Sequence, residues 1–197
     1  MKPGNSNFVA RIPDWFPTRK AAQVVAFFAA KAGGKINILR ATKMVYLSDR
    51  ASMAAYDHPI TGDDFVSMKF GPVNTYTYSY MNGEIDRGHE QWAEFIDKRD
   101  GYDIPLAKAV DDLVEDLDEL SPAELRVLEE TWAEFKDIEK YELAEWTHKF
   151  CPEWRDPAGS SIPIGFATVF KRLEKPEPVE LAEEIQAERR LAQMMAG

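Results

Sequence analysis

The chain has 197 residues, of which 45% are hydrophobic and 29% are charged, proportions typical of one globular domain with or without an appendage. Its single cysteine, Cys151, excludes an internal disulfide and fits a reducing cytoplasm. Its net charge of −10 argues against a nonspecific nucleic-acid binder, because such proteins gain affinity mainly by neutralising phosphates.

The first predicted elements are an N-terminal lead and a buried helix. Residues 1–17 show no periodic pattern, whereas Thr18 is a good helix cap and Gly33-Gly34 is a stop signal. Apolar residues between them cover most of the helix circumference, which predicts a central, buried helix.

The apolar run over 21–30 is far shorter than the ~20 residues that cross a membrane, and the preceding stretch does not fit a signal peptide. We therefore expect a cytoplasmic protein without a membrane segment.

The charge is distributed unevenly along the chain. Residues 1–50 contain nine Lys or Arg and two Asp, which gives 9 − 2 = +7, so the remainder carries −10 − 7 = −17. Such an acidic surface suits a basic partner, for example a nucleic-acid-acting enzyme that is held in check. The alternative is a solvated surface that only confers solubility, and charge alone favours this alternative.

The second predicted helix runs from Asn37, its cap, to about Tyr56. At 100° per residue, Asp49 falls in the middle of the apolar stripe of this helix instead of on its polar face. A buried carboxylate must be paired or hydrogen-bonded. The candidate partners are Arg50 and the backbone N–H groups of the loop that follows the helix.

The sequence pattern over residues 59–106 predicts a small antiparallel sheet. The stretch 65–70 alternates apolar and polar residues, a strand signal, and Gly71-Pro72 is expected to end it. An aromatic helix should follow, with Asn74 as a possible cap. Residues 91–97 and 102–106 flank Asp100-Gly101, a hairpin signal, so we expect three short strands in all, with Pro105 at an edge.

The rest of the chain is predicted to be helical. Residues 106–120 have heptad-like apolar spacing, and Ser121 with Glu124 forms a capping box that starts the next helix. A shorter helix carries Leu143 and Trp146, residues 151–163 form a loop, and 164–174 form another helix. Pro176 and Pro178 mark a hinge before a last helix over 179–195, whose weak apolar face predicts loose attachment.

The expected fold class is therefore mainly α (α+β), a helical domain with a small three-stranded antiparallel sheet plus a C-terminal helix. The expected organisation is a lead over 1–17, a domain over 18–175 and a helical appendage over 176–197.

No set of residues in the sequence matches a known catalytic or metal site. The stretch "PITGDDF" has one glycine followed by two acids, which would repel phosphate. Asp63 and Asp64 would face opposite ways on a strand, so a turn-capping role is favoured over acid–base catalysis. His148 and Cys151 lack a second ligand pair for a metal, and Cys151 has no activating motif.

A cluster of aromatic residues allows two interpretations. Tyr76, Tyr78 and Tyr80, with Trp92, could form a platform on which bases stack, or a hydrophobic core between helix and sheet. The acidic charge favours the core, so we expect no nucleic-acid partner.

One stretch, "KMVYLSDRASMAAYDHPITGDDFVSMKFGPV" over 43–73, resembles the Panacea domain of SocA-like antitoxins. Its motif residues are Lys43, Tyr46, Leu47, Asp49, Arg50, Pro59, Ile60, Thr61, Gly62, Asp63, Gly71, Pro72 and Val73. The likeness continues weakly through "LSPAELRVLEETWAEF" and "ELAEWTHKFCPEW" and covers about residues 18–175.

This resemblance implies an antitoxin of a bacterial or phage-associated type II toxin–antitoxin system, which neutralises a cognate toxin by direct protein contact. The toxin would be encoded by the adjacent gene, and the motif residues would be structural or partner-binding. The SocA-like branch implies an alternative, a proteolytic adaptor that delivers a toxin to the ClpXP protease. The resemblance implies no enzyme activity, cofactor or metal, and an enzyme that uses Asp49 or Asp63 is an alternative of low weight.

Overall fold

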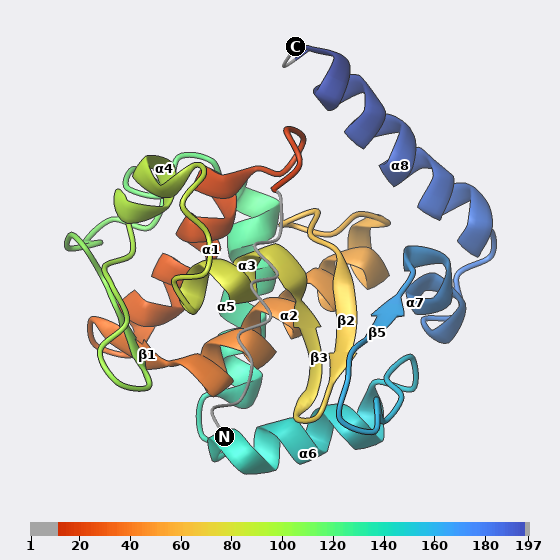
Figure 1. Ribbon diagram of the computed structural model, residues 1–197, viewed down its shortest axis with the longest axis horizontal. Coiled ribbons are helices and arrows are strands. Elements are labelled where there is room, and N and C mark those ends of the chain that lie inside the picture. Colours follow the sequence, from red (N-terminus) through yellow and green to blue (C-terminus); the bar gives the residue numbers. More distant parts are fainter. Residues whose placement is uncertain (1–11, 196–197) are drawn as a thin grey trace, which may run out of the picture.

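Two long helices form the centre of the fold. The computed structural model describes residues 12–195; residues 1–11, most of the expected lead, lie outside the described part. Helix α1 (Thr18–Lys31) is buried along almost its whole length, as its all-round apolar pattern predicted. Helix α2 (Ile38–Tyr56) runs through the middle of the molecule and carries the large buried side chains Tyr46, Met44 and Met53 (Figure 1).

Two further helices pack against α2. These are α5 (Pro122–Phe135) and α6 (Lys140–Phe150), which enclose the core with the short helices α3 (Thr75–Met81) and α4 (His89–Ala93). The predicted caps are confirmed at two starts. Asn37 accepts from the N–H of Leu39 at 3.1 Å, and Ser121 and Glu124 exchange the two bonds of a capping box.

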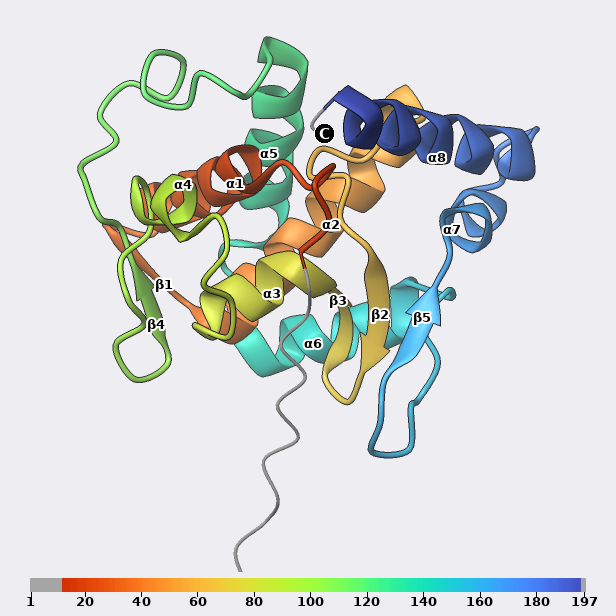
Figure 2. The same cartoon turned by 45° about the horizontal axis from the view of Figure 1, so that its top comes forward.

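A three-stranded antiparallel sheet lies beside α2, in the order β3-β2-β5 (Figure 2). Strand β2 (Phe65–Met68) pairs with β3 (Gly71–Asn74) on one side and with β5 (Ile162–Ile164) on the other. A second, two-stranded sheet joins β1 (Lys35–Asn37) to β4 (Asp103–Pro105). The expected fold class, mainly α with a small three-stranded antiparallel sheet and a C-terminal helix, is therefore confirmed.

The membership of the three-stranded sheet differs from the prediction. Gly71 does not end the strand: its φ of 101° lets the chain turn back, so 71–74 forms β3 with Pro72 on an edge strand. Residues 91–97 form no strand, because the α4 turn stacks Trp92 on Tyr80 at 4.9 Å inside the core. Strand β4, within the predicted 102–106, pairs with β1, and only an isolated bridge between Ile96 and Leu106 joins the two arms of the predicted hairpin.

The predicted helix over 106–120 is wrong. Aspartate side chains in this segment accept hydrogen bonds from nearby backbone N–H groups: Asp112 from Val114 and Glu115, and Asp116 from Asp111 and Asp112. Such bonds offer the backbone an alternative to the helix. The segment forms turns that still bury Leu117.

The C-terminal part consists of α7 (Phe166–Arg172), shorter than the expected 164–174, and α8 (Pro178–Met195). Helix α8 lies at the edge of the molecule, against α7, and its C-terminal end extends away from the body (Figure 1). It is attached by Ile185, 2% exposed, and by Arg189, 9% exposed. The boundaries of the expected lead, domain and appendage stay a prediction.

Candidate functional site

The motif residues of the sequence meet in one corner of the molecule. This motif corner consists of residues 43–50 of α2, the loop over 59–64, and residues 71–74 of β3. Nearly all of these side chains point inward, and each polar one has an identifiable partner.

Asp49 ties the loop to α2. It is fully buried, and its carboxylate accepts from the N–H of Thr61 at 2.9 Å, from the Thr61 hydroxyl, and from the amide of Asn74 at 2.7 Å. Of the two partners predicted for Asp49, the loop N–H groups are therefore confirmed, whereas Arg50 binds Glu153 instead. Burial raises the pKa of Asp49 to about 6, and the bonds from Thr61 and Asn74 act against this rise.

Asp63 caps helix α3 from the preceding loop. Its buried carboxylate accepts from the N–H groups of Tyr76 and Thr77 at 3.0 and 2.8 Å, and from the Thr77 hydroxyl at 2.8 Å. Asp63 therefore caps the start of a helix, where a turn cap was expected, whereas Asn74, the possible cap of this helix, binds Asp49 instead. Burial raises the pKa of Asp63 to about 7 despite these donors.

Lys43 and Gly71 fix the hairpin against α2. The buried Lys43 ammonium donates to the carbonyl of Pro72 at 2.7 Å, and burial lowers the pKa of this lysine to about 7. A Cβ atom at position 71 would lie 2.3 Å from the hydroxyl of Thr147 on α6. Glycine is therefore required here both for its positive φ and for the close approach of α6.

Tyr46 and Arg50 share one buried acceptor, Glu153. The tyrosine hydroxyl donates to Glu153 at 2.6 Å and the guanidinium Nε donates to the same oxygen at 2.7 Å. The Glu153 side chain is completely buried, and its pairing with Arg50 means that the buried carboxylate charge is not left without a partner. Sequence reasoning did not single out Glu153, although it lies in the quoted "CPEW" segment.

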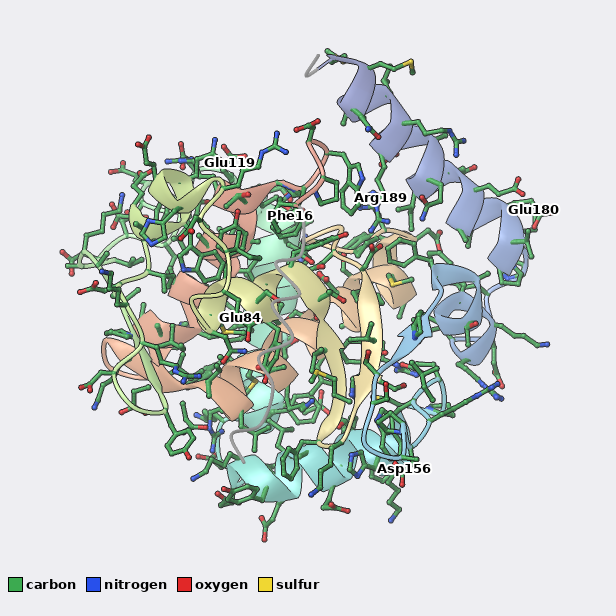
Figure 3. The ribbon with its side chains drawn as sticks, viewed as in Figure 1. Phe16, Glu84, Glu119, Asp156, Glu180 and Arg189 are labelled. Carbon is green, nitrogen blue, oxygen red and sulfur yellow. The ribbon has the colours of Figure 1, made fainter. Side chains whose placement is uncertain are left out.

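The remaining motif residues shape the loop and the sheet. Pro59 and Val73 are buried, and Gly62 adopts a φ of 59°. The Gly62 carbonyl accepts from Arg189 of α8 at 2.5 Å, and the same guanidinium donates to Asp64 at 2.7 Å. Figure 3 shows Arg189 between α8 and the rest of the molecule. No sequence signal pointed to Arg189, which lies far outside the motif.

These contacts describe a structural network. The carboxylates of Asp49 and Asp63 are buried, and protein donors occupy their oxygens. Among residues 12–195, no three His, Cys, Asp or Glu side chains are placed to hold a metal ion. His148 stacks on Trp154 at 3.9 Å, and burial raises the pKa of the Cys151 thiol to about 12, which disfavours the nucleophilic thiolate.

The aromatic cluster belongs mainly to the core. Tyr80 and Trp92 are 4% and 3% exposed and stack on each other, so they offer no open platform for bases. Tyr76 and Tyr78 are half-buried and pack against the same core. Within the described part of the chain, no helix is both long and apolar enough to cross a membrane.

Comparison with known proteins gives one match. The sequence model described as "Antitoxin SocA-like, Panacea domain" matches residues 42–155, which is more than half of the chain and includes the whole motif corner. No curated protein and no solved structure gives a significant match.

Proposed function

The chain belongs to the SocA-like antitoxin family with a Panacea domain, and on this premise we propose that it neutralises a protein toxin by binding directly to it. The observation that carries the proposal is the family match over residues 42–155. The family suggests a non-enzymatic role in which the partner is a protein. The toxin of a type II system would be the product of the neighbouring gene, and the two proteins would meet in the cytoplasm.

The geometry of the motif corner supports a role in binding instead of catalysis. Asp49, Asp63 and Glu153 are all buried with their oxygens hydrogen-bonded to the protein itself. These carboxylates stabilise the junction of α2, the loop and the hairpin. A partner can therefore contact only the exposed side chains around the motif corner. A rigid scaffold that presents a surface is what an occluding antitoxin requires.

Co-expression tests this proposal. The neighbouring gene product, expressed alone, should arrest growth, and co-expression with this protein should restore growth. The two proteins should also copurify as a complex. A neighbouring product that is harmless, or that neither binds nor is neutralised, would contradict direct neutralisation.

A proteolytic adaptor is the second candidate, favoured by the free end of α8. Leu191, Met194 and Met195 lie on one face of this helix and are 55, 72 and 80% exposed, while Arg189 holds the middle of the helix on the motif corner. Such an end could engage the ClpXP protease while the domain holds a toxin. The half-life of the toxin, measured in cells with and without ClpXP, should then shorten only when protein and protease are both present.

A further inference from the structure

A groove of about 600 Å³ lies next to the motif corner. Its walls come from the start of α2, the turn between β2 and β3, the end of α3, the turn before β4, and the start of α6. In Figure 1 the β2–β3 turn points toward α6, at the lower edge of the view. We name this site the basic groove; its rim consists of Lys69, Phe70, Arg99, Tyr102, Lys140 and Tyr141.

The charge of the basic groove is opposite to that of the chain as a whole. No Asp or Glu lines it, although the sequence contains 34 acidic and only 24 basic residues. Among the described residues, Lys69 and Arg99 have no carboxylate within salt-bridge distance, and Arg99 instead donates to the side chain of Asn82 at 2.6 Å. Of the three rim cations, only Lys140 has a carboxylate within salt-bridge distance, that of Glu139 at 3.5 Å. These rim cations are available to carboxylates of a partner.

The rim also exposes apolar surface. Phe70, Tyr102 and Tyr141 are 48, 77 and 56% exposed, and they are three of the five large exposed aromatic side chains in the described part of the chain. Lys69 and Lys140 lie 5.5 and 5.1 Å from the ring centroids of Phe70 and Tyr141. The rings of Phe70 and Tyr141 thus each lie beside a cation, and Trp, Tyr and Arg are the residue types enriched where interfaces bind strongly.

We propose that the basic groove binds an extended acidic segment of the toxin that carries at least one aromatic or large apolar side chain. This inference rests on the proposed function and adds the surface and the chemistry of the partner. Carboxylates of the segment would pair with Lys69 and Arg99, and its apolar side chain would pack on the exposed rings. A nucleic-acid strand offers similar groups, but the net charge of −10 opposes a long polyanion that extends beyond the groove.

The first test uses the isolated protein and a peptide. A short fluorescein-labelled peptide of alternating glutamate and tryptophan should bind, and the same peptide with glutamine in place of glutamate should bind much more weakly. The double variant Lys69→Glu/Arg99→Glu should weaken binding by about tenfold or more. The reason is that each substitution removes a charge-assisted contact to the peptide and places a like charge in its stead. Added salt should also weaken binding.

The matched control is Lys171→Glu/Arg172→Glu on α7. These two residues are exposed and lie outside the groove, and the double change alters the net charge by the same amount. It should leave the affinity for the peptide nearly unchanged. Equal losses in both double variants, or no binding of the glutamate peptide to the wild type, would overturn the proposal. Tighter binding of oligothymidine than of the peptide, lost in Lys69→Glu/Arg99→Glu, would assign the groove to nucleic acid instead.

The second test measures binding and growth rescue with the neighbouring gene product. Lys69→Glu/Arg99→Glu should lose binding by about tenfold or more and lose rescue, while the α7 control keeps both. If the groove variant binds the toxin as well as the wild type, the groove is not the toxin site, although direct neutralisation still stands. If the wild type does not bind the product, the proposed function fails, and the peptide test alone decides what the groove binds.

Discussion

Replacement of Asp49 separates a structural carboxylate from a functional one. Asp49→Ala removes the common acceptor of three buried donors: the N–H and hydroxyl of Thr61 and the amide of Asn74. Each buried donor left without a partner costs about 1–3 kcal/mol, partly offset because a buried charge disappears. We therefore expect a loss of about 3–5 kcal/mol in the free energy of unfolding, a large fraction of a typical domain's stability.

Asp49→Asn is the matched variant, and the structure predicts a much smaller effect. The new amide keeps one oxygen for the N–H of Thr61, and its nitrogen faces Thr61 and Asn74. Because the Asn74 carbonyl oxygen is buried and has no partner within the described residues, a flip of this amide would let it accept the new N–H. The expected loss is about 1 kcal/mol, with growth rescue retained.

Urea unfolding followed by tryptophan fluorescence measures both variants, with the midpoint and slope compared with the wild type. A free energy of unfolding for Asp49→Ala within about 1 kcal/mol of the wild type would show that Asp49 does not tether the loop to α2. If that stable variant also loses toxin binding, the carboxylate acts on the partner and is not a tether.

Three further predictions concern other contacts of the motif corner. Arg189→Ala should cost about 2 kcal/mol and speed hydrogen exchange in α8, whereas the exposed Arg190→Ala should do neither; equal effects would contradict the anchoring of α8 by Arg189. Gly71→Ala should destabilise by about 2 kcal/mol or more, seen as a lower melting temperature, because the new Cβ would meet Thr147 at 2.3 Å on a backbone with positive φ. The third prediction is pH dependence: since the folded-state pKa of Asp63 is raised from 3.8 to about 7, its contribution to stability is full below pH 3.8 and is lost as the pH rises to 7. Urea midpoints should therefore fall more steeply between about pH 4 and 7 in the wild type than in Asp63→Asn, and identical slopes would contradict the shift.

The sequence predicted those features of the fold that depend on residues close together in the chain. The cap at Asn37, the capping box at Ser121 and the burial of Asp49 all follow from spacing within a few residues or turns of helix. The resemblance of 43–73 to the Panacea domain likewise agrees with the family match. The burial of nearly all motif side chains was not predicted, because a motif shows which residues occur together and not which way they point.

The errors arise where distant segments decide the structure. Strand β5 escaped prediction because it is three residues long and pairs with β2, with Phe65 opposite Ile164. Glu153 could not be recognised as the acceptor for Tyr46, since more than a hundred residues separate them. In 106–120 the heptad-like spacing was real, but the bonds of Asp112 and Asp116 to the backbone favoured turns.

The pairing of β2 with β5 also sets an order of events during synthesis. Trp154 donates to the carbonyl of Met68 and the N–H of Arg155 to the hydroxyl of Ser67, so residues 151–164 complete a corner that residues 43–74 begin. These closures join segments far apart in the chain, so they form only after residues 151–164 have been synthesised. A nascent chain therefore cannot complete the motif corner until residues 151–164 have left the ribosome.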